Sequence, residues 1–368
     1  MSILRLYLLS ALIIAVHFLA VSRGFYFIGP NPISKVIDSA ISVAETGSFS
    51  SPHYYKLMEE VRSASLDIDG LVWQDIASIG RNGILLPKHS IISPIISAPF
   101  YKFFGFGGLY LSHFCIVLTL LLSLISLFER YFPNNFPLPI FFLALFALNP
   151  IVLFELGIYG YDIQIATFVI AGLALSFSRP LLGAGLLALS VFIRPSSVIL
   201  LFPLQVLLLT LGSSAFPPFS KKRFFDLIMG TAIIYGGYGL VMWILYGTPL
   251  TTPYHNLPEF VRGAIGISNH PSGGDLSLLF KDLKAKLFNL DVGLVYAAPI
   301  LIFSFIIFFV KELSIWSRLS IFATVLVSLL FVYSYSMWDL VVPRIFYPIS
   351  LILSTFVIGW IGRVLRNR

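Results

Sequence analysis

The stretch SVFIRPSSVILLF, residues 190 to 202, places one arginine and one proline in the middle of a long apolar run. A cationic side chain near the middle of a bilayer costs at least about 2.5 to 3.5 kcal/mol. The run is therefore either one helix that carries this cost or two helices joined by a turn at Arg194 and Pro195. The choice decides how often the chain crosses a membrane and on which side its later loops lie.

The composition predicts a polytopic membrane protein. Of the 368 residues, 58% are hydrophobic and 11% are charged, and the mean hydropathy is +0.92, far from the average soluble domain. The formal charge of +7 does not indicate a nucleic-acid partner, because the bases do not form one stripe with interleaved aromatic residues. A single cysteine, Cys115, excludes an intrachain disulfide and a CxxC metal or redox site.

Apolar runs of suitable length predict about ten transmembrane helices. They lie near residues 3–22, 106–128, 137–154, 161–178, 181–193, 196–213, 224–246, 292–311, 315–334 and 341–362. The first run also resembles a signal peptide, with Arg5 as its basic flank and small residues before a cleavage point. The many later runs and the orientation argument below favour an uncleaved first span.

The distribution of bases tests whether residues 181–213 form one span or two, because Lys and Arg collect in short cytoplasmic loops. With the amino terminus inside and a turn at 194–197, the cytoplasmic segments hold Arg5, Arg130, Arg179, Lys221, Lys222, Arg223, Lys311, Arg318, Arg363, Arg366 and Arg368. A single fused span would send the later bases outside. We therefore predict two helices, both termini in the cytoplasm, and Arg194 at a turn near the outer surface, where it also suits contact with lipid headgroups.

Two long segments, 23–105 and 247–291, lie on the outer side in this topology. The first contains a predicted amphipathic helix in ISKVIDSAISVAETGSF, a polar helix in YYKLMEEVRSASLD and a short helix in WQDIASIG. The apolar run up to Gly105 is too short and too rich in proline to cross, which favours an interfacial or re-entrant element. We treat residues 1–368 as one all-α polytopic domain with a large first outer loop.

Most polar side chains with reactive groups fall on the outer side. They are Asp38, Asp67, Asp69, Asp75, Lys88, His89, Glu155, Asp162, Arg194, Tyr254, His255, Trp338, Asp339 and Arg344. The span interiors have almost no acids, so a proton relay or midplane ion site lacks its usual parts, and we expect His113 to make a packed polar contact. At one face of a membrane, basic side chains can hold a lipid phosphate, and a carboxylate can deprotonate the hydroxyl group of an acceptor.

Six segments, in their order along the chain, resemble a known family. They are AETGSF (44–49), GILLPKHSIISPIISAPFYKFFG (83–105), NPIVLFELGIYGYD (149–162), LALSVFIRPSSVILLFPL (187–204), LYGTPLTTPY (245–254) and VPRIFYPISLIL (342–353). Together they are similar to segments of the GT-C superfamily of polyprenyl-phosphate-sugar-dependent glycosyltransferases, in the branch of protein O-mannosyltransferases and aminoarabinose transferases. The resemblance covers most of the chain.

The resemblance implies a GT-C-like membrane fold, a polyprenyl-phosphate sugar donor and a lipid, glycan or protein acceptor. It assigns Asp38 as general base, Asp162 as the acid that orients acceptor or metal, Lys88, Arg194 and Arg344 as phosphate ligands, and His89, Glu155, Tyr254 and His255 as substrate contacts. The family's acidic pair falls near Asn31 and Pro32, where this chain has no acid, so Asp69 and Asp75 stay open as alternative bases. A mechanism with one carboxylate as general base and no carboxylate nucleophile is typical of inversion at the anomeric centre.

Each assignment has a simpler structural alternative. Asp38 also fits the solvated face of an amphipathic helix, Asp162 the N-cap of the fourth span, and Arg344 a salt bridge with Asp339. Tyr254 and His255 also fit an ordinary loop. We find no His/Asp/Glu cluster with the ligand spacing of a metal site, so no cofactor is expected, although a divalent metal stays open.

Three other classes compete with a transferase. A flippase or transporter for a lipid-linked sugar would show gapped half-helices and intramembrane charges, and we find neither. An outer-face glycan polymerase or ligase would have its large loop later in the chain. A purely structural membrane protein is the remaining class. No retention signal is found, which favours the inner membrane of a prokaryotic cell.

Overall fold

The computed structural model describes residues 33–50, 78–87, 91–133, 138–150, 152, 156, 160–193, 198–211, 220–249, 298–334 and 347–366. This part of the chain is mostly helical. Its α-helices are α2 (Ile33–Thr46), α4 (Ile92–Phe104), α5 (Phe106–Tyr131), α6 (Leu138–Leu148), α8 (Tyr161–Leu175), α9 (Pro180–Ile193), α10 (Val198–Thr210), α11 (Lys221–Tyr246), α15 (Ile315–Ser334) and α17 (Tyr347–Arg366). Two 3-10 helices, η2 (Arg81–Gly83) and η5 (Pro299–Phe309), and a hairpin of β1 (Ser78–Ile79) and β2 (Leu85–Leu86) complete it.

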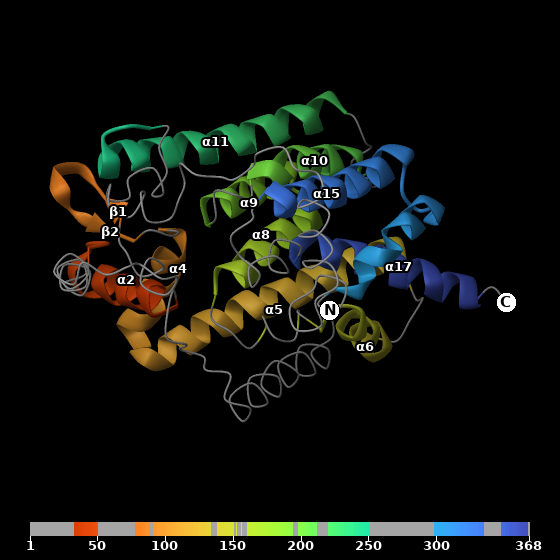
Figure 1. The fold of residues 1–368 in the computed structure, drawn as a ribbon, viewed down its shortest axis with the longest axis horizontal. Coiled ribbons are helices and arrows are strands. Elements are labelled where there is room, and N and C mark those ends of the chain that lie inside the picture. Colours follow the sequence, from red (N-terminus) through yellow and green to blue (C-terminus); the bar gives the residue numbers. More distant parts are fainter. Residues whose placement is uncertain are drawn as a thin grey trace, which may run out of the picture.

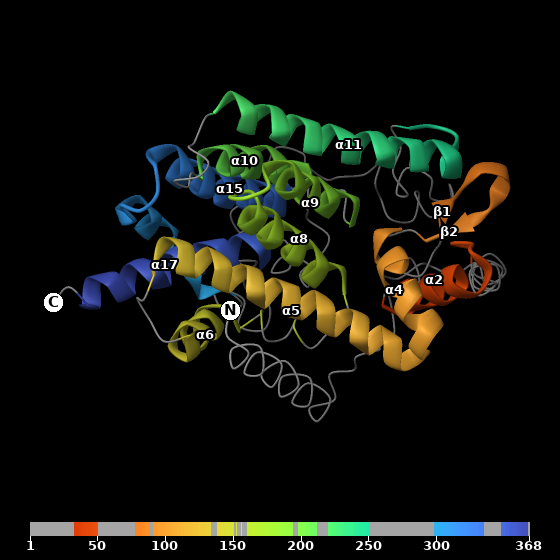
Figure 2. The same ribbon diagram turned by 180° about the vertical axis from the view of Figure 1, so that it is seen from behind.

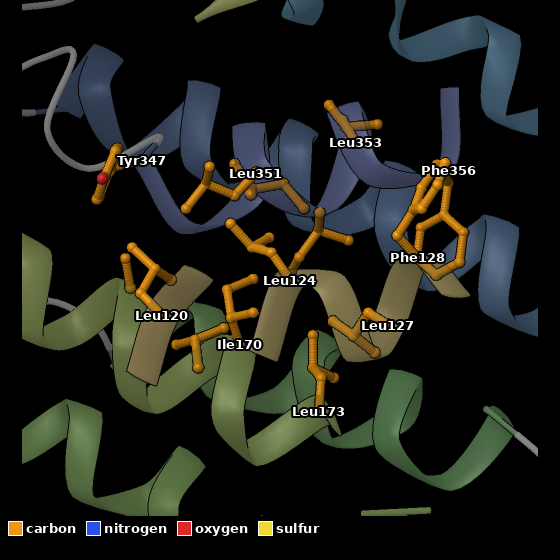
Figure 3. Close-up of a cluster of buried hydrophobic side chains, with 14 of the residues drawn as sticks. Leu120, Leu124, Leu127, Phe128, Ile170, Leu173, Tyr347, Leu351, Leu353 and Phe356 are labelled. Atoms are coloured by element: carbon orange, nitrogen blue, oxygen red, sulfur yellow. The ribbon is translucent and has the colours of Figure 1, made fainter. Parts of the chain in front are cut away.

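Helices α5, α8 and α17 form the centre of an elongated bundle. Figures 1 and 2 show α9, α10, α11 and α15 on one side of this centre, and α2, α4 and the β-hairpin at one end. Apolar side chains fill the contact between the three central helices, among them Leu124, Ile170 and Leu351 (Figure 3). Because these residues come from helices far apart in the sequence, the core joins the two halves of the chain.

In the described part of the chain, three helices are long and apolar enough to cross a membrane by length and composition: α5, α11 and α17. Shorter apolar helices occupy the other described runs that the sequence predicts as spans. The run at 292–311 contains η5, an eleven-residue 3-10 helix, so its described part is wound more tightly than the expected α-helix. The predicted first span, 3–22, lies outside the described residues, and the ten-span topology stays a prediction.

The apolar run around Arg194 contains two helices, α9 and α10, on either side of residues 194–197, which lie outside the described part. The guanidinium of Arg223 joins their far ends, since it donates to the carbonyl of Leu208 at 2.6 and 3.1 Å and to the Ser176 hydroxyl at 3.5 Å. Leu208 lies in the last turn of α10, and Ser176 follows the end of α8 in the turn that leads to α9. The two helices also pack against each other, so they run in opposite directions, as predicted.

The turn before α9 depends on small residues. A Cβ on Gly183 of α9 would lie 2.6 Å from the Gly172 carbonyl oxygen of α8 and 2.9 Å from Ser176. Only glycine allows the two backbones to approach this closely. Helices α8 and α9 therefore form a tight antiparallel pair inside the bundle.

The predicted amphipathic helix in ISKVIDSAISVAETGSF is present as α2. Helix α2 ends at Thr46, and Gly47 follows with φ 74°, where its N–H donates to the Val43 carbonyl at 3.0 Å. This left-handed residue is the usual glycine end of a helix. The predicted short helix in WQDIASIG is wrong in its described part, because Ser78 and Ile79 pair with Leu85 and Leu86 as a β-hairpin.

Candidate functional site

Asp38 and Asp162 are the predicted site residues that the structure describes. Lys88, His89, Glu155, Arg194, Tyr254, His255 and Arg344 lie outside the described residues. The convergence of all nine side chains stays a prediction.

Asp38 lies on α2 next to a face that is packed into a small core. Ile37 and Ala40 of this face are buried with Leu109 of α5, and Tyr161 packs against them. Asp38 itself is half-buried. Asp38 therefore lies beside packed side chains. This position is more enclosed than the fully solvated helix face that is the alternative interpretation of this residue.

Asp162 lies in the first turn of α8 and is only 7% exposed. The N-cap of this helix is Gly160, so the interpretation of Asp162 as the N-cap residue is wrong. A carboxylate within the first turn is still favoured by the helix dipole. Because Asp162 is buried at the start of a helix and lies near other polar side chains, its carboxylate has less conformational freedom than it would have in a loop.

Tyr161 connects the two acids structurally. Its ring packs against the small core of α2 and also against the main core of the bundle. Asp162 is the next residue, and Ile37 of the small core directly precedes Asp38. Helix α2 packs on α4, and the start of α8 reaches the same small core through Tyr161, so two acids separated by more than one hundred residues follow residues of one core. Figure 1 shows α2 and the start of α8 toward the same end of the molecule.

A buried seam of polar side chains runs between α4, α5 and α8 at this end. The Ser93 hydroxyl donates to the amide oxygen of Gln164, and Ser97 and Ser112 share a hydrogen bond of 3.1 Å. His113 contacts the Leu156 carbonyl through Nε2 at 3.0 Å, which confirms the packed polar contact expected of it. The sequence analysis missed Ser93, Ser97 and Gln164, although the four-residue spacing of the serines would place both on one face of α4.

Two further contacts involve the elements at the α2 end, one with α11 and one between α4 and α2. The Ser78 hydroxyl of the hairpin and the Tyr246 hydroxyl at the end of α11 are 2.6 Å apart. Tyr101 of α4 donates a weak hydrogen bond of 3.5 Å to the exposed carboxylate of Glu45 on α2. Burial, with a smaller effect of the Glu45 charge, raises the pKa of Tyr101 above its usual 10.0, so this hydroxyl stays a donor at neutral pH.

The arrangement offers proton acceptors and hydroxyl groups at the junction of an amphipathic helix with the bundle. Among the described residues, no group of three His, Cys, Asp or Glu side chains could hold a metal ion. Carboxylates in such a place can accept a proton or orient a hydroxyl group.

Comparison with protein-family models, with curated proteins and with solved structures finds no match for this chain.

Proposed function

We propose that the protein is an inverting glycosyltransferase that uses a polyprenyl-phosphate sugar at the outer face of a membrane. The small core that Ile37 of α2 and Tyr161 of α8 share carries this proposal, because Asp38 and the buried Asp162 directly follow these two residues. The resemblance of the six sequence segments to the GT-C superfamily supports the choice of donor.

In the proposed reaction, the Asp38 carboxylate takes the proton of an acceptor hydroxyl group as the hydroxyl oxygen attacks the anomeric carbon. The bond from that carbon to the phosphate oxygen breaks, and its electron pair stays on the lipid phosphate. One displacement inverts the anomeric centre. The Asp162 carboxylate orients the acceptor by accepting a hydrogen bond from a second polar group of the acceptor, not from the hydroxyl that attacks.

The leaving phosphate gains charge in the transition state. Fixed cations in a partly dry site stabilise this charge more than they stabilise the bound donor, and this difference lowers the barrier. We assign this role to Lys88, Arg194 and Arg344, and we assign substrate contacts to His89, Glu155, Tyr254 and His255.

The opposite end of the bundle supports the orientation of the proposed site. The described ends of α5 and α17 and the starts of α9, α11 and α15 carry bases there. Since bases collect on the cytoplasmic side, the end with Asp38 and Asp162 faces the outer side in a multi-pass protein whose termini are cytoplasmic.

The test is an assay of the purified full chain in lipid, with a panel of polyprenyl-phosphate sugars and the variants Asp38→Asn and Asp162→Asn. Loss of a general base lowers the rate by roughly 100-fold or more, and we expect this loss for Asp38→Asn. Glu45→Gln is the matched control, because Glu45 is an exposed acid on the same helix, and it should keep full activity.

Two outcomes would contradict the assignment at different levels. Full activity in Asp38→Asn removes Asp38 as the base and directs attention to Asp69 and Asp75. Absence of transfer from every polyprenyl-phosphate sugar in the unmodified protein, while the chain stays folded in the same lipid, contradicts the transferase itself.

A further inference from the structure

Basic residues from several helices gather at the end of the bundle opposite α2. The described ones are Arg130, Arg179, Lys221, Lys222, Arg223, Lys311, Arg318, Arg363 and Arg366, and the described acids there are Glu129, Asp226 and Glu312. At the α2 end, by contrast, the described helices and hairpin carry equal numbers of acids and bases. The excess positive charge is therefore confined to one end.

Some of these bases are occupied by structural contacts. Arg223 is fully buried and binds the Leu208 carbonyl. Arg363 pairs with Glu312, and Arg318 donates to the carbonyl of Phe308 at 2.8 Å. These side chains hold the ends of helices together, so they are not the ones that an external anion would use.

Exposed bases from three parts of the chain lie near the turn between α8 and α9. The guanidinium of Arg130 lies 4.1 Å from the centre of the Phe177 ring, and exposed Arg179 follows two residues later. Arg223 reaches Ser176 of the same turn, which brings the exposed Lys221 and Lys222 to its side. Four exposed cations from three parts of the chain thus surround residues 176–180.

The surface beside this turn is apolar. Phe224 and Phe225, which follow the two lysines on α11, are 53% and 62% exposed, and Trp316 at the start of α15 is 56% exposed. These residues lie at the ends of apolar helices, where a membrane span meets water. Bases beside exposed aromatic residues at such a position match a ligand with an anionic head and an apolar tail.

We propose that the α8–α9 turn, with Arg130, Arg179, Lys221 and Lys222, binds the headgroup of an anionic phospholipid, whose acyl chains lie along Phe224 and Phe225 of α11. The inference does not depend on sugar transfer. A free phosphate would use the same cations but would gain nothing from the apolar side chains.

The test measures binding of phosphatidylglycerol and phosphatidylcholine to the purified full chain by native mass spectrometry from detergent. The variant Arg179→Gln/Lys221→Gln/Lys222→Gln removes three exposed charges, and we expect phosphatidylglycerol binding to weaken by about tenfold or more. Phosphatidylcholine binding should not change. The matched control is Arg81→Gln/Lys102→Gln, which removes exposed bases at the other end and should leave binding unchanged.

Equal weakening in the control variant, or no weakening in the triple variant, would overturn the site. A second measurement uses the unmodified protein, whose bound phosphatidylglycerol should be displaced by high salt but not by millimolar inorganic phosphate. Displacement by inorganic phosphate at that concentration would show that the turn binds a soluble anion and would overturn the lipid assignment.

Discussion

The two ends of the bundle are built in different ways. At the basic end, contacts link helices that are far apart in the sequence: Arg223 joins α8, α10 and α11, Arg363 joins α17 to Glu312, and Ser317 of α15 donates to Thr210 of α10 at 3.0 Å. At the opposite end, a small core and a few hydrogen bonds attach α2, α4 and the hairpin to the bundle.

The difference follows from alternating helix direction. At the basic end, α8 ends just before α9 begins, and Arg223 at the start of α11 binds the last turn of α10. At the other end, the described part of the segment before α5 contributes α2, the hairpin and α4. We infer that contacts at the basic end contribute most to the free energy of unfolding. Substitutions at the α2 end should therefore destabilise the fold less.

The largest effect should come from Arg223→Met. This change removes the donors to the Leu208 carbonyl and leaves a buried acceptor at the end of α10, which costs about 3 kcal/mol. Unfolding of the purified protein in mixed micelles would measure the loss of unfolding free energy. Lys222→Met is the control, because the neighbouring Lys222 is exposed and its removal should change stability by less than about 0.5 kcal/mol. Equal effects of the two variants would contradict the structural role of Arg223.

Most helix positions could be predicted from the sequence because the length of an apolar run indicates a helix and the bases between two runs indicate a connecting loop. The separation of α9 from α10 is the clearest example, since it rests on Arg194, Pro195 and the later bases. The buried position of Arg223 could not be predicted in this way. A base at a helix start looks the same in the sequence whether it faces water or binds the carbonyl of another helix.

The site could be predicted only in outline. The sequence pattern of α2 indicates an amphipathic helix, but it does not show what the apolar face packs against. The small core of that face includes a contact with Tyr161, more than one hundred positions later. The bond from Ser93 to Gln164 also joins distant segments, and single serines carry no signal of such a partner. Contacts of this kind arise from the packing of whole helices, which local patterns do not specify.

A smaller loss is expected for Gly183→Ala, which tests how tightly the basic side of the bundle is packed. The new methyl group would meet the Gly172 carbonyl and Ser176, and such overpacking costs about 1 to 3 kcal/mol. Gly237→Ala is the matched control on α11, where no atom lies within 4 Å of the added carbon and alanine favours the helix. Unfolding in mixed micelles should show destabilisation for the first variant only. A stabilised Gly183→Ala protein would mean that α8 and α9 are less closely packed.

The smallest effect is expected for Tyr246→Phe at the α2 end. The variant removes the hydroxyl that bonds to Ser78, a net loss of about 1 kcal/mol, while Ser78 keeps its contacts with the carbonyls of Leu86 and Pro87 at 3.3 and 3.4 Å. Hydrogen exchange of the full chain should therefore speed up in residues 78–86 and stay unchanged at the start of α11. Tyr110→Phe, an exposed tyrosine of α5, serves as control. Faster exchange around Arg223 in the Tyr246 variant would show that the two ends unfold together, and the contrast between a stable basic end and a separately attached α2 end would then be wrong.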